Sequence, residues 1–212
     1  MKKIFLIILF FCFQLSPAQH SKLNGEFYLN KRKDFIERMP ENSVAVLFSA
    51  PIRNRSNDVD YIFHQDPNFF YLTGWHQPHS VLLIYKNPQK DSKGYFNEKI
   101  YILERDEYKE LWNGRRYSIK EVEKYHFERV TTRNYFLEDI SNLTDFDKVL
   151  MFSFHNDIRD KDDDPYDLFD LKAAFKRAIN FPSSFNEDLY AVYQHILSVN
   201  EYNYQSILEK VK

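Results

Sequence analysis

The segment from Tyr61 to Trp75 constrains the fold of this chain more than any other stretch. It holds six aromatic residues, which are Tyr61, Phe63, Phe69, Phe70, Tyr71 and Trp75. Pro67 favours extended backbone in the residue before it, and Gly74 permits a tight reversal of the chain. Each buried ring removes a large apolar area from water, worth about 25 cal/mol per Å². The residues of this segment that we expect in the core are Phe69, Phe70 and Leu72.

Charged residues precede this aromatic segment, at Arg53, Arg55, Asp58 and Asp60. They have two interpretations. They form paired charges at the mouth of a sheet, or they lie in a solvated loop, where each surface pair is worth less than about 1 kcal/mol.

The N-terminus has the pattern of a secretory signal peptide. Lys2 and Lys3 precede an apolar run from Ile4 to Leu15, and residues 16–18 are of the kind that signal peptidase reads. We therefore predict a signal peptide over residues 1–18 and a secreted or periplasmic location. The run is too short to span about 30 Å of hydrocarbon as a helix. No stable membrane insertion is expected after cleavage, and an uncleaved anchor is the alternative interpretation.

The composition predicts a domain that depends on an apolar core. Cys12 is the only cysteine and lies in the predicted signal, so the mature chain forms no disulfide. Aromatic residues make up 17% of the chain and supply material for that core. The whole chain has four glycines, which disfavours a Gly-rich nucleotide-binding loop. Its net charge of −2 provides no basic field, so a nucleic-acid partner is not expected.

Short apolar runs alternate with helical patterns, which predicts an α/β fold with a mixed β-sheet flanked by helices on its faces. The expected strands are Val44–Phe48, Ser80–Tyr85, Lys99–Leu103 and Lys148–Phe152. The expected helices are Asn24–Met39, Asp106–Trp112, Ser118–Tyr125, Arg133–Leu143 and Tyr166–Ile179. Ser118 and Glu121 have the spacing of a capping box. The polar stretch Asn87–Gly94 predicts a longer loop that joins the second and third strands as a hairpin.

We divide the predicted mature chain into a domain over residues 19–180 and a C-terminal helix over residues 181–212. Ser184 and Glu187 have capping-box spacing at the start of that helix. Its apolar stripe comprises Leu189, Val192, Ile196, Val199 and Tyr202. Either the stripe packs on the domain, or part of it contacts a partner, as a linker to a further domain would.

Two segments carry a resemblance to a known family. In the first, the matching positions are Arg55, Ser56, Asp60, Tyr61, Phe63, Gln65, Phe69, Tyr71, Thr73 and Gly74. The second, Glu110–Arg116, is similar to a Trp-x-Gly-Arg-Arg turn of the same family. Over roughly residues 31–120, the chain resembles the amino-terminal domain of aminopeptidase P, the Xaa-Pro aminopeptidase of the creatinase–prolidase group. Gln77 departs from the pattern, because the family commonly has an acid at this position.

The resemblance implies candidate interface or substrate-edge residues. In oligomeric members of the family, the Trp turn lies between subunits and approaches the neighbour's active site. The resemblance therefore suggests, as interface or substrate-edge residues, Trp112, Arg115 and Arg116, together with the matched positions Arg55 and Tyr71. An exposed indole beside guanidinium groups also has the composition of a binding hot spot. The alternative is that Trp112 is buried at the C-terminal end of a helix.

We predict no catalytic residue, metal ligand or cofactor within this chain. The resemblance implies that two divalent ions, usually manganese, bind a catalytic domain through Asp, His and Glu side chains expected downstream of Lys212. The sequence contains no Gly-x-Ser-x-Gly or His-Glu-x-x-His motif. His76 and His79 have no acid near them in the sequence. The run Asp160–Asp164 is interpreted as a solvated loop, with weak Ca²⁺ binding as the alternative.

Two functions remain as expectations. The first is a non-catalytic domain of a manganese-dependent Xaa-Pro aminopeptidase that contributes to substrate selection or assembly. Peptides would then be substrates only if a catalytic domain is present. The second is a standalone secreted module that forms homo-oligomers or docks on a full-length aminopeptidase paralogue.

Overall fold

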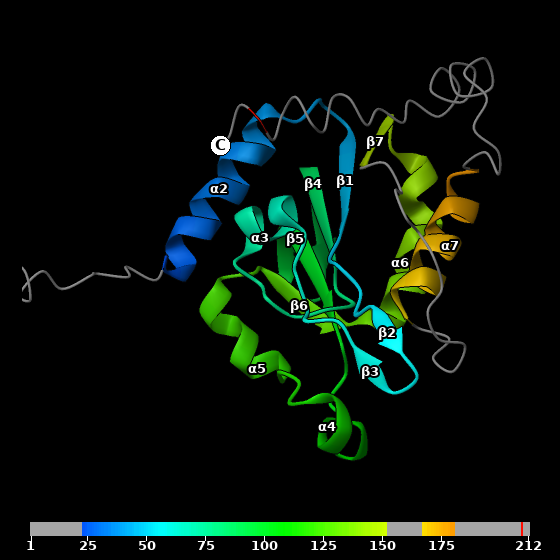
Figure 1. Cartoon of the computed structure of the whole chain (residues 1–212). Coiled ribbons are helices and arrows are strands. Elements are labelled where there is room, and N and C mark those ends of the chain that lie inside the picture. Colours follow the sequence, from blue (N-terminus) through cyan, green and yellow to red (C-terminus); the bar gives the residue numbers. More distant parts are fainter. Residues whose placement is uncertain (1–22, 152–166, 181–208, 210–212) are drawn as a thin grey trace, which may run out of the picture.

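The computed structural model of the chain describes residues 23–151, 167–180 and 209. At the centre is a five-stranded sheet with helices on both faces (Figure 1). Its strands are β1 (Ser43–Phe48), β4 (Val81–Asp91), β5 (Gly94–Ile102), β6 (Arg129–Thr132) and β7 (Lys148–Met151). The helices are α2 (Gly25–Arg38), α3 (Pro67–Thr73), α4 (Glu107–Asn113), α5 (Ile119–Val122), α6 (Phe136–Asp139) and α7 (Leu168–Ala178).

The order of the strands, β6-β5-β4-β1-β7, makes the sheet mixed. The central pairs β1–β4 and β4–β5 are antiparallel, and the outer pairs β5–β6 and β1–β7 are parallel. The mixed sheet with flanking helices was predicted from the sequence, and the prediction is confirmed.

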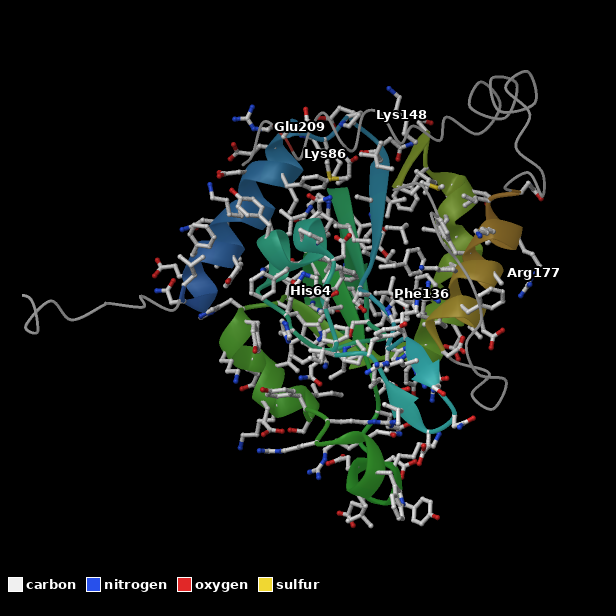
Figure 2. The ribbon with its side chains drawn as sticks, viewed as in Figure 1. His64, Lys86, Phe136, Lys148, Arg177 and Glu209 are labelled. Carbon is white, nitrogen blue, oxygen red and sulfur yellow. The ribbon has the colours of Figure 1, made fainter. Side chains whose placement is uncertain are left out.

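Alternate residues of the strands supply two apolar cores, one on each face of the sheet. Helices α2 and α3 cover the first face, and α6 and α7 cover the second (Figure 1). On β1, for example, Ala45 and Leu47 face the first core, whereas Val44 and Val46 face the second. Phe136 of α6 packs between the sheet and neighbouring rings, with ring centroids 6.0 Å from Phe48 and 5.3 Å from Tyr101 (Figure 2).

A buried ion pair ties the first face together. Arg32 of α2 is fully buried, and its Nε donates to Glu98 on β5 at 2.5 Å. Its other donors reach the carbonyls of Leu72, Tyr125 and His126. The guanidinium also lies 4.4 Å from the ring centroid of Phe127. One side chain therefore fixes α2, α3, β5 and the segment after α5 to each other.

The strand and helix predictions were wrong at several places. Asn87–Gly94 is not a loop: β4 runs to Asp91, β5 starts at Gly94, and a two-residue turn joins them. The register shifts between Ile84 and Gln89, so Pro88, which has no N–H to donate, sits at the irregularity rather than in a regular ladder. The predicted helix Arg133–Leu143 is three short pieces, a 3₁₀ turn (Arg133–Tyr135), α6 and a second 3₁₀ turn (Ile140–Asp145).

Other elements were missed because their signals are short. Helix α3 forms within the aromatic segment: Asp66 accepts a hydrogen bond from the Phe69 amide at 2.7 Å, and Pro67 occupies the first turn. Gly74 ends the helix in the left-handed conformation, with φ 63°. Strand β6 was also not predicted. Phe69 and Leu72 are in the core as predicted, but Phe70 is 38% exposed because a helix places adjacent residues on different faces.

Parts of the predictions lie outside the described residues. These are the signal peptide, the acidic run at 160–164, and the C-terminal helix with its apolar stripe, of which only Glu209 is described, as helical. Among the residues that the structure describes, no helix is long and apolar enough to cross a membrane.

Candidate functional site

Helix α4 presents its apolar side chains to solvent. It begins at the N-cap Asp106, whose carboxylate accepts from the Lys109 amide at 3.0 Å, and it ends at Gly114, with φ 82°. It projects below the sheet in the view of Figure 1, and none of its residues is buried. Its exposed apolar residues are Tyr108, Leu111 and Trp112, and Trp112 is 78% exposed. This excludes the alternative in which Trp112 is buried in the core.

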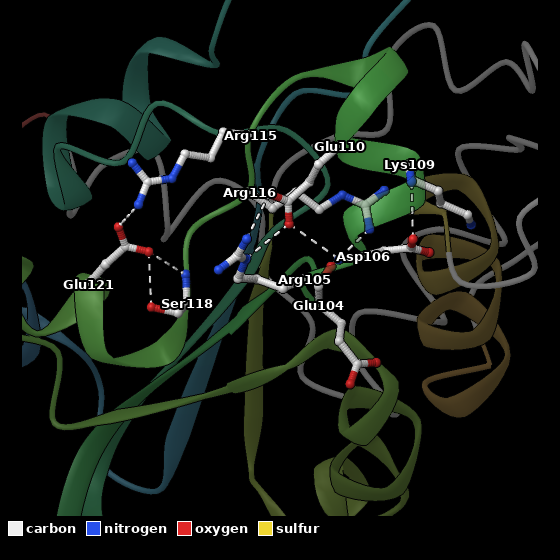
Figure 3. Close-up of polar contacts among 9 residues, drawn as sticks. All are labelled: Glu104, Arg105, Asp106, Lys109, Glu110, Arg115, Arg116, Ser118 and Glu121. Carbon is white, nitrogen blue, oxygen red and sulfur yellow. Dashed lines mark hydrogen bonds and ion pairs between the residues drawn. The ribbon is translucent and has the colours of Figure 1, made fainter.

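The carboxylate of Glu110 braces this helix and the turn after it (Figure 3). Its two oxygens accept from Arg105 Nε at 3.0 Å and from Nη2 at 3.2 Å, and Oε1 also faces the Asp106 amide at 3.3 Å. The Arg105 hydrogen bond is the main cause that lowers the pKa of Glu110, and the backbone N–H of Arg116 contributes. Glu110 therefore joins the chain before α4 to the chain after it, and Trp112 stands on a closed loop.

A second carboxylate, that of Glu121, contacts one of the two arginines at the end of this loop. Glu121 accepts from the backbone N–H of Ser118 at 2.9 Å, which completes the predicted capping box, and it pairs with Arg115 (Figure 3). The hydrogen bonds from Ser118 lower the pKa of Glu121. Arg116 donates to the carbonyl of Glu104 at 2.8 Å. The two guanidinium groups therefore have fixed directions next to Trp112.

A cavity of about 780 Å³ opens beside this loop. Segments far apart in the sequence line it: the region around the ribbon β2 (Asn54–Ser56) and β3 (Val59–Asp60), the turn at 76–79, α4 with its turn, and the start of α7. Of the predicted site residues, Trp112, Arg115 and Arg116 line it. A volume of this size is in the range of small-ligand and peptide sites.

The other two predicted site residues lie elsewhere. Arg55 is exposed on β2 and is not among the residues that line the cavity. Tyr71 lies on α3, half-buried against the first core, with its ring edge-on to Phe27 at 6.3 Å. The structure therefore brings three of the five candidates together. The charged stretch that precedes the aromatic segment contains the β2–β3 ribbon. In this ribbon the Asn54 side chain donates to the carboxylate of Asp60 at 3.2 Å.

Several residues of the cavity were not identified from the sequence. They are Ile62, Tyr108, Arg133, Phe169 and Lys172. No local pattern connects α7 to the aromatic segment more than 90 positions earlier, so only the fold shows their proximity. The exposed face of α4 was detectable, because Tyr108, Leu111 and Trp112 have helical spacing on a short polar helix.

His79 lies where three of these segments meet. Its backbone is left-handed, with φ 54°, and its ring nitrogens lie 3.5 Å from the Ile52 amide and 3.4 Å from the Leu168 amide. A neutral imidazole accepts at one nitrogen only, and both distances are long for a hydrogen bond. His79 therefore links the turn, the loop after β1 and the start of α7.

The described residues do not form a metal centre. Within ranges 23–151 and 167–180, no three His, Cys, Asp or Glu side chains gather closely enough to hold an ion. His76 contacts aromatic rings, edge-on to Phe63 at 5.3 Å, rather than acids.

The fold defines a class of protein, the α/β domains in which helices flank a mixed five-stranded sheet. The family described as "Aminopeptidase P, N-terminal domain" matches residues 28–150, and the chain belongs to this family. This family is the one that the motifs implied, and its members named below are Xaa-Pro aminopeptidases.

Individual relatives agree with this assignment. The chain is 35% identical over 98 residues to Xaa-Pro aminopeptidase 3 of Dictyostelium discoideum, a match that covers 46% of this chain and 18% of that protein. It is 36% identical over 103 residues to the Xaa-Pro aminopeptidase of Haemophilus influenzae, covering 49% of this chain and 23% of the relative. The matches thus span about a fifth of these relatives.

Solved structures show the same fold. Aminopeptidase P from Escherichia coli with the inhibitor Pro-Leu superposes with a TM-score of 0.55 at 26% identity, over 63% of this chain and 30% of that chain. Aminopeptidase PepP of Pseudomonas aeruginosa gives a TM-score of 0.59 at 24% identity, over 74% of this chain and 32% of that chain.

Proposed function

We propose that this chain is a non-catalytic domain of an Xaa-Pro aminopeptidase assembly, in which it contributes to substrate selection or to assembly. The observation that carries the proposal is Trp112, 78% exposed on a loop that Glu110 and Glu121 brace at the edge of the cavity. An aromatic side chain on a braced backbone leaves little backbone freedom to lose when a partner covers it. Such residues, flanked by arginine, are typical of binding hot spots.

The loop would act as an edge of a neighbouring active site. A catalytic domain would supply the two manganese ions and the attacking water. This domain would narrow the entrance to that active site, so that only the free amino end of a peptide enters. The rigid Glu110 brace supports this role, because a positioning group must hold its geometry when substrate arrives.

Affinity for a full-length Xaa-Pro aminopeptidase tests the proposal. Trp112→Ala is expected to weaken the complex about thirtyfold, because truncation of a hot-spot tryptophan costs about 2 kcal/mol or more. Tyr95→Ala, an equally exposed aromatic at the β4–β5 turn, is the matched control and should leave the dissociation constant unchanged. Sedimentation or surface binding measures both. Equal affinities for the two variants would contradict the proposal.

An activity assay tests the second part of the proposal, that the chain is non-catalytic. The purified chain, incubated with Mn²⁺ and an Xaa-Pro peptide, is expected to show no turnover of its own. Hydrolysis that a chelator abolishes would overturn the non-catalytic assignment.

The second candidate function is a standalone binding or oligomerisation module that docks on a full-length paralogue. The observation that favours it is the row of exposed apolar residues on α4, a helix that buries none of its own side chains. Concentration-dependent self-association that Leu111→Ser and Trp112→Ala abolish would favour this candidate over the first.

We also propose export of the chain and removal of residues 1–18, followed by action in the periplasm or outside the cell. The pattern of the N-terminus supports this. Mass spectrometry of the protein purified from its own cells should find Gln19 as the first residue, and an intact Met1 would contradict it.

A further inference from the structure

The chain contains two Asn-Gly dipeptides, Asn24-Gly25 and Asn113-Gly114. This dipeptide is especially prone to spontaneous loss of the asparagine amide, because glycine has no side chain that hinders attack by its own backbone nitrogen. The reaction needs a backbone that can bring this nitrogen onto the asparagine Cγ. The two sites therefore differ in reactivity mainly through what the fold does to each of them.

The first dipeptide is locked into the start of α2. The Asn24 side chain is the N-cap of this helix and accepts from the Phe27 amide at 3.0 Å. Gly25 is packed so closely that an added methyl would clash with the Lys124 carbonyl and the His126 ring. Attack at this site requires the first turn of α2 to open, with loss of both the cap and the packing.

The second dipeptide is open. Asn113 is the last residue of α4, and both it and Gly114 are exposed. Apart from its neighbours in the chain, an added methyl at Gly114 would have no atom within 4 Å. Within the residues that the structure describes, the Asn113 side chain makes no hydrogen bond. Nothing on the page of contacts around this dipeptide therefore opposes the approach of the Gly114 nitrogen to the asparagine side chain.

The end of α4 is also less restrained than that of α3. Gly74 closes α3 by donating its N–H to the Phe70 carbonyl at 2.7 Å, whereas in the described part of the chain no such bond closes α4 at Gly114. Helix ends without a closing bond fray. The brace described above holds residues 110 and 116, and the 113–114 peptide lies between these two points. Its backbone can therefore reach the geometry of attack while the brace stays in place.

We propose that Asn113-Gly114 is a modification site, at which the chain converts its own asparagine to aspartate and isoaspartate. The Gly114 nitrogen gives its proton to water and attacks Cγ of Asn113. The N–Cγ bond forms, the Cγ–Nδ2 bond breaks and ammonia leaves, so that a succinimide joins the two residues. Water then opens the succinimide at either carbonyl, which leaves aspartate or isoaspartate at position 113.

Both products change the loop that carries Trp112. Each adds a negative charge beside Trp112 in the chain. Isoaspartate also routes the backbone through the former side chain and lengthens it by a methylene between Trp112 and Arg116. Glu110 accepts from the Arg116 backbone N–H, and a longer backbone alters this closure. For the effect on binding, the inference rests on the proposed function: conversion should weaken the complex with a full-length Xaa-Pro aminopeptidase.

Peptide mapping by mass spectrometry measures the conversion at both sites in the purified chain, kept at mildly alkaline pH. In the folded chain, Asn113 should convert at least about tenfold faster than Asn24, because Asn24 must first lose its cap and packing. In concentrated urea, which removes the fold, the two sites should convert at similar rates. Asn113→Gln is the matched control and should keep its amide, since the longer side chain closes a ring more slowly.

Each outcome of the mapping decides the inference. Equal conversion of Asn24 and Asn113 in the folded chain would overturn it. A difference of the same size in urea would also overturn it, because the neighbouring residues in the sequence, and not the fold, would then set the rates.

The effect on binding is measured with aged and fresh protein. The aged chain should bind a full-length aminopeptidase about tenfold more weakly than the fresh chain, while aged Asn113→Gln keeps the affinity of its fresh form. Unchanged affinity after full conversion would refute this effect. If the fresh chain forms no complex, the proposed function fails, and the mapping still decides whether the site is modified.

Discussion

The two tryptophans of this chain each lie near a glycine with positive φ, yet one is buried and the other is exposed. Trp75 follows Gly74 and is buried, with its indole N–H donating to the Ser80 hydroxyl at 2.8 Å. Trp112 precedes Gly114 by two positions and is 78% exposed. Trp75 packs in the first core against Tyr117 and Tyr125, whereas Arg115 and Arg116 beside Trp112 contact Glu121 and Glu104. The comparison shows that one family signature stabilises the domain and the other presents a surface.

The polar residues near each tryptophan follow the same division. Buried Gln65 donates to the carbonyls of Trp75 and Gln77 and accepts from the Ala50 amide at 2.7 Å, which fixes the strand ends around the first tryptophan. Glu110 does the same for the second tryptophan, but all of its partners lie between residues 105 and 116. Polar groups near Trp75 thus join distant segments, and those near Trp112 close a local loop.

The largest expected difference is between the two tryptophans themselves. Trp75→Ala should lower the free energy of unfolding by about 3–5 kcal/mol, because it opens a cavity in a packed core. Trp112→Ala should change it by less than about 0.5 kcal/mol, as surface substitutions do. Urea denaturation measures both. Similar values for the two variants would mean that Trp112 packs on the domain in solution.

Two arginines extend the comparison to charge. Arg32→Met should destabilise the fold by about 3 kcal/mol, because it leaves Glu98 buried without its partner. The loss is at the low end for such pairs, since Glu98 can take up a proton. Arg115→Met removes an exposed pair with Glu121 and should cost under about 1 kcal/mol. Comparable destabilisation by both, measured in the same denaturation series, would contradict the division into core and surface.

Two glycines with positive φ test the same comparison between the core around Trp75 and the loop around Trp112. Gly74→Ala should cost more than about 2 kcal/mol, because the left-handed backbone is unfavourable and the new methyl would clash with the Tyr28 ring. Gly114→Ala has no atom within 4 Å of the new methyl and should cost about 1–3 kcal/mol from backbone strain alone. The melting temperatures of the two variants show which substitution destabilises the fold more. A larger loss at Gly114 would show that the loop packs against something.

The smallest expected difference is between the pKa values of two carboxyl groups, one in the core and one in the loop. Burial raises the pKa of Glu98, while hydrogen bonds from Arg105 lower the pKa of Glu110. A lowered pKa stabilises the folded state above the ordinary glutamate range, and this stabilisation is lost as the pH falls through the lowered value. The Glu110 brace should therefore persist in mild acid, where Glu98 already takes up its proton. Carboxyl ¹³C titration should place Glu98 above Glu110.

Asp91 is the control for that titration. Hydrogen bonds from Arg129 lower its pKa to about 2, so it should titrate after both glutamates. A pKa of Glu110 that is not lowered from its ordinary value would show that the brace is absent in solution.

The periodicity of the chain was sufficient to predict most of the fold. Apolar runs at Val44–Phe48 and Val81–Tyr85 became central strands, since a run buried on both faces has few other stable arrangements. The capping box at Ser118 predicted a helix start, because its hydrogen bonds are local. Short elements were less predictable. Helix α3 and strand β6 each have few residues, so their own propensity does not distinguish them, and tertiary packing decides.

The sequence by itself determined the family, through residue types at fixed spacing, and it named Trp112, Arg115 and Arg116 as site candidates. Only the tertiary structure decided which residues join them. Arg133 directly follows β6, which pairs in parallel with β5, so it lies at the same end of the sheet as α4, which follows β5. Lys172 on α7 lines the same cavity. Proximity across such sequence distances is set by the fold rather than by any local pattern. Exposure was decided in the same way, since Trp75 and Trp112 differ in what the fold packs around them and not in their own chemistry.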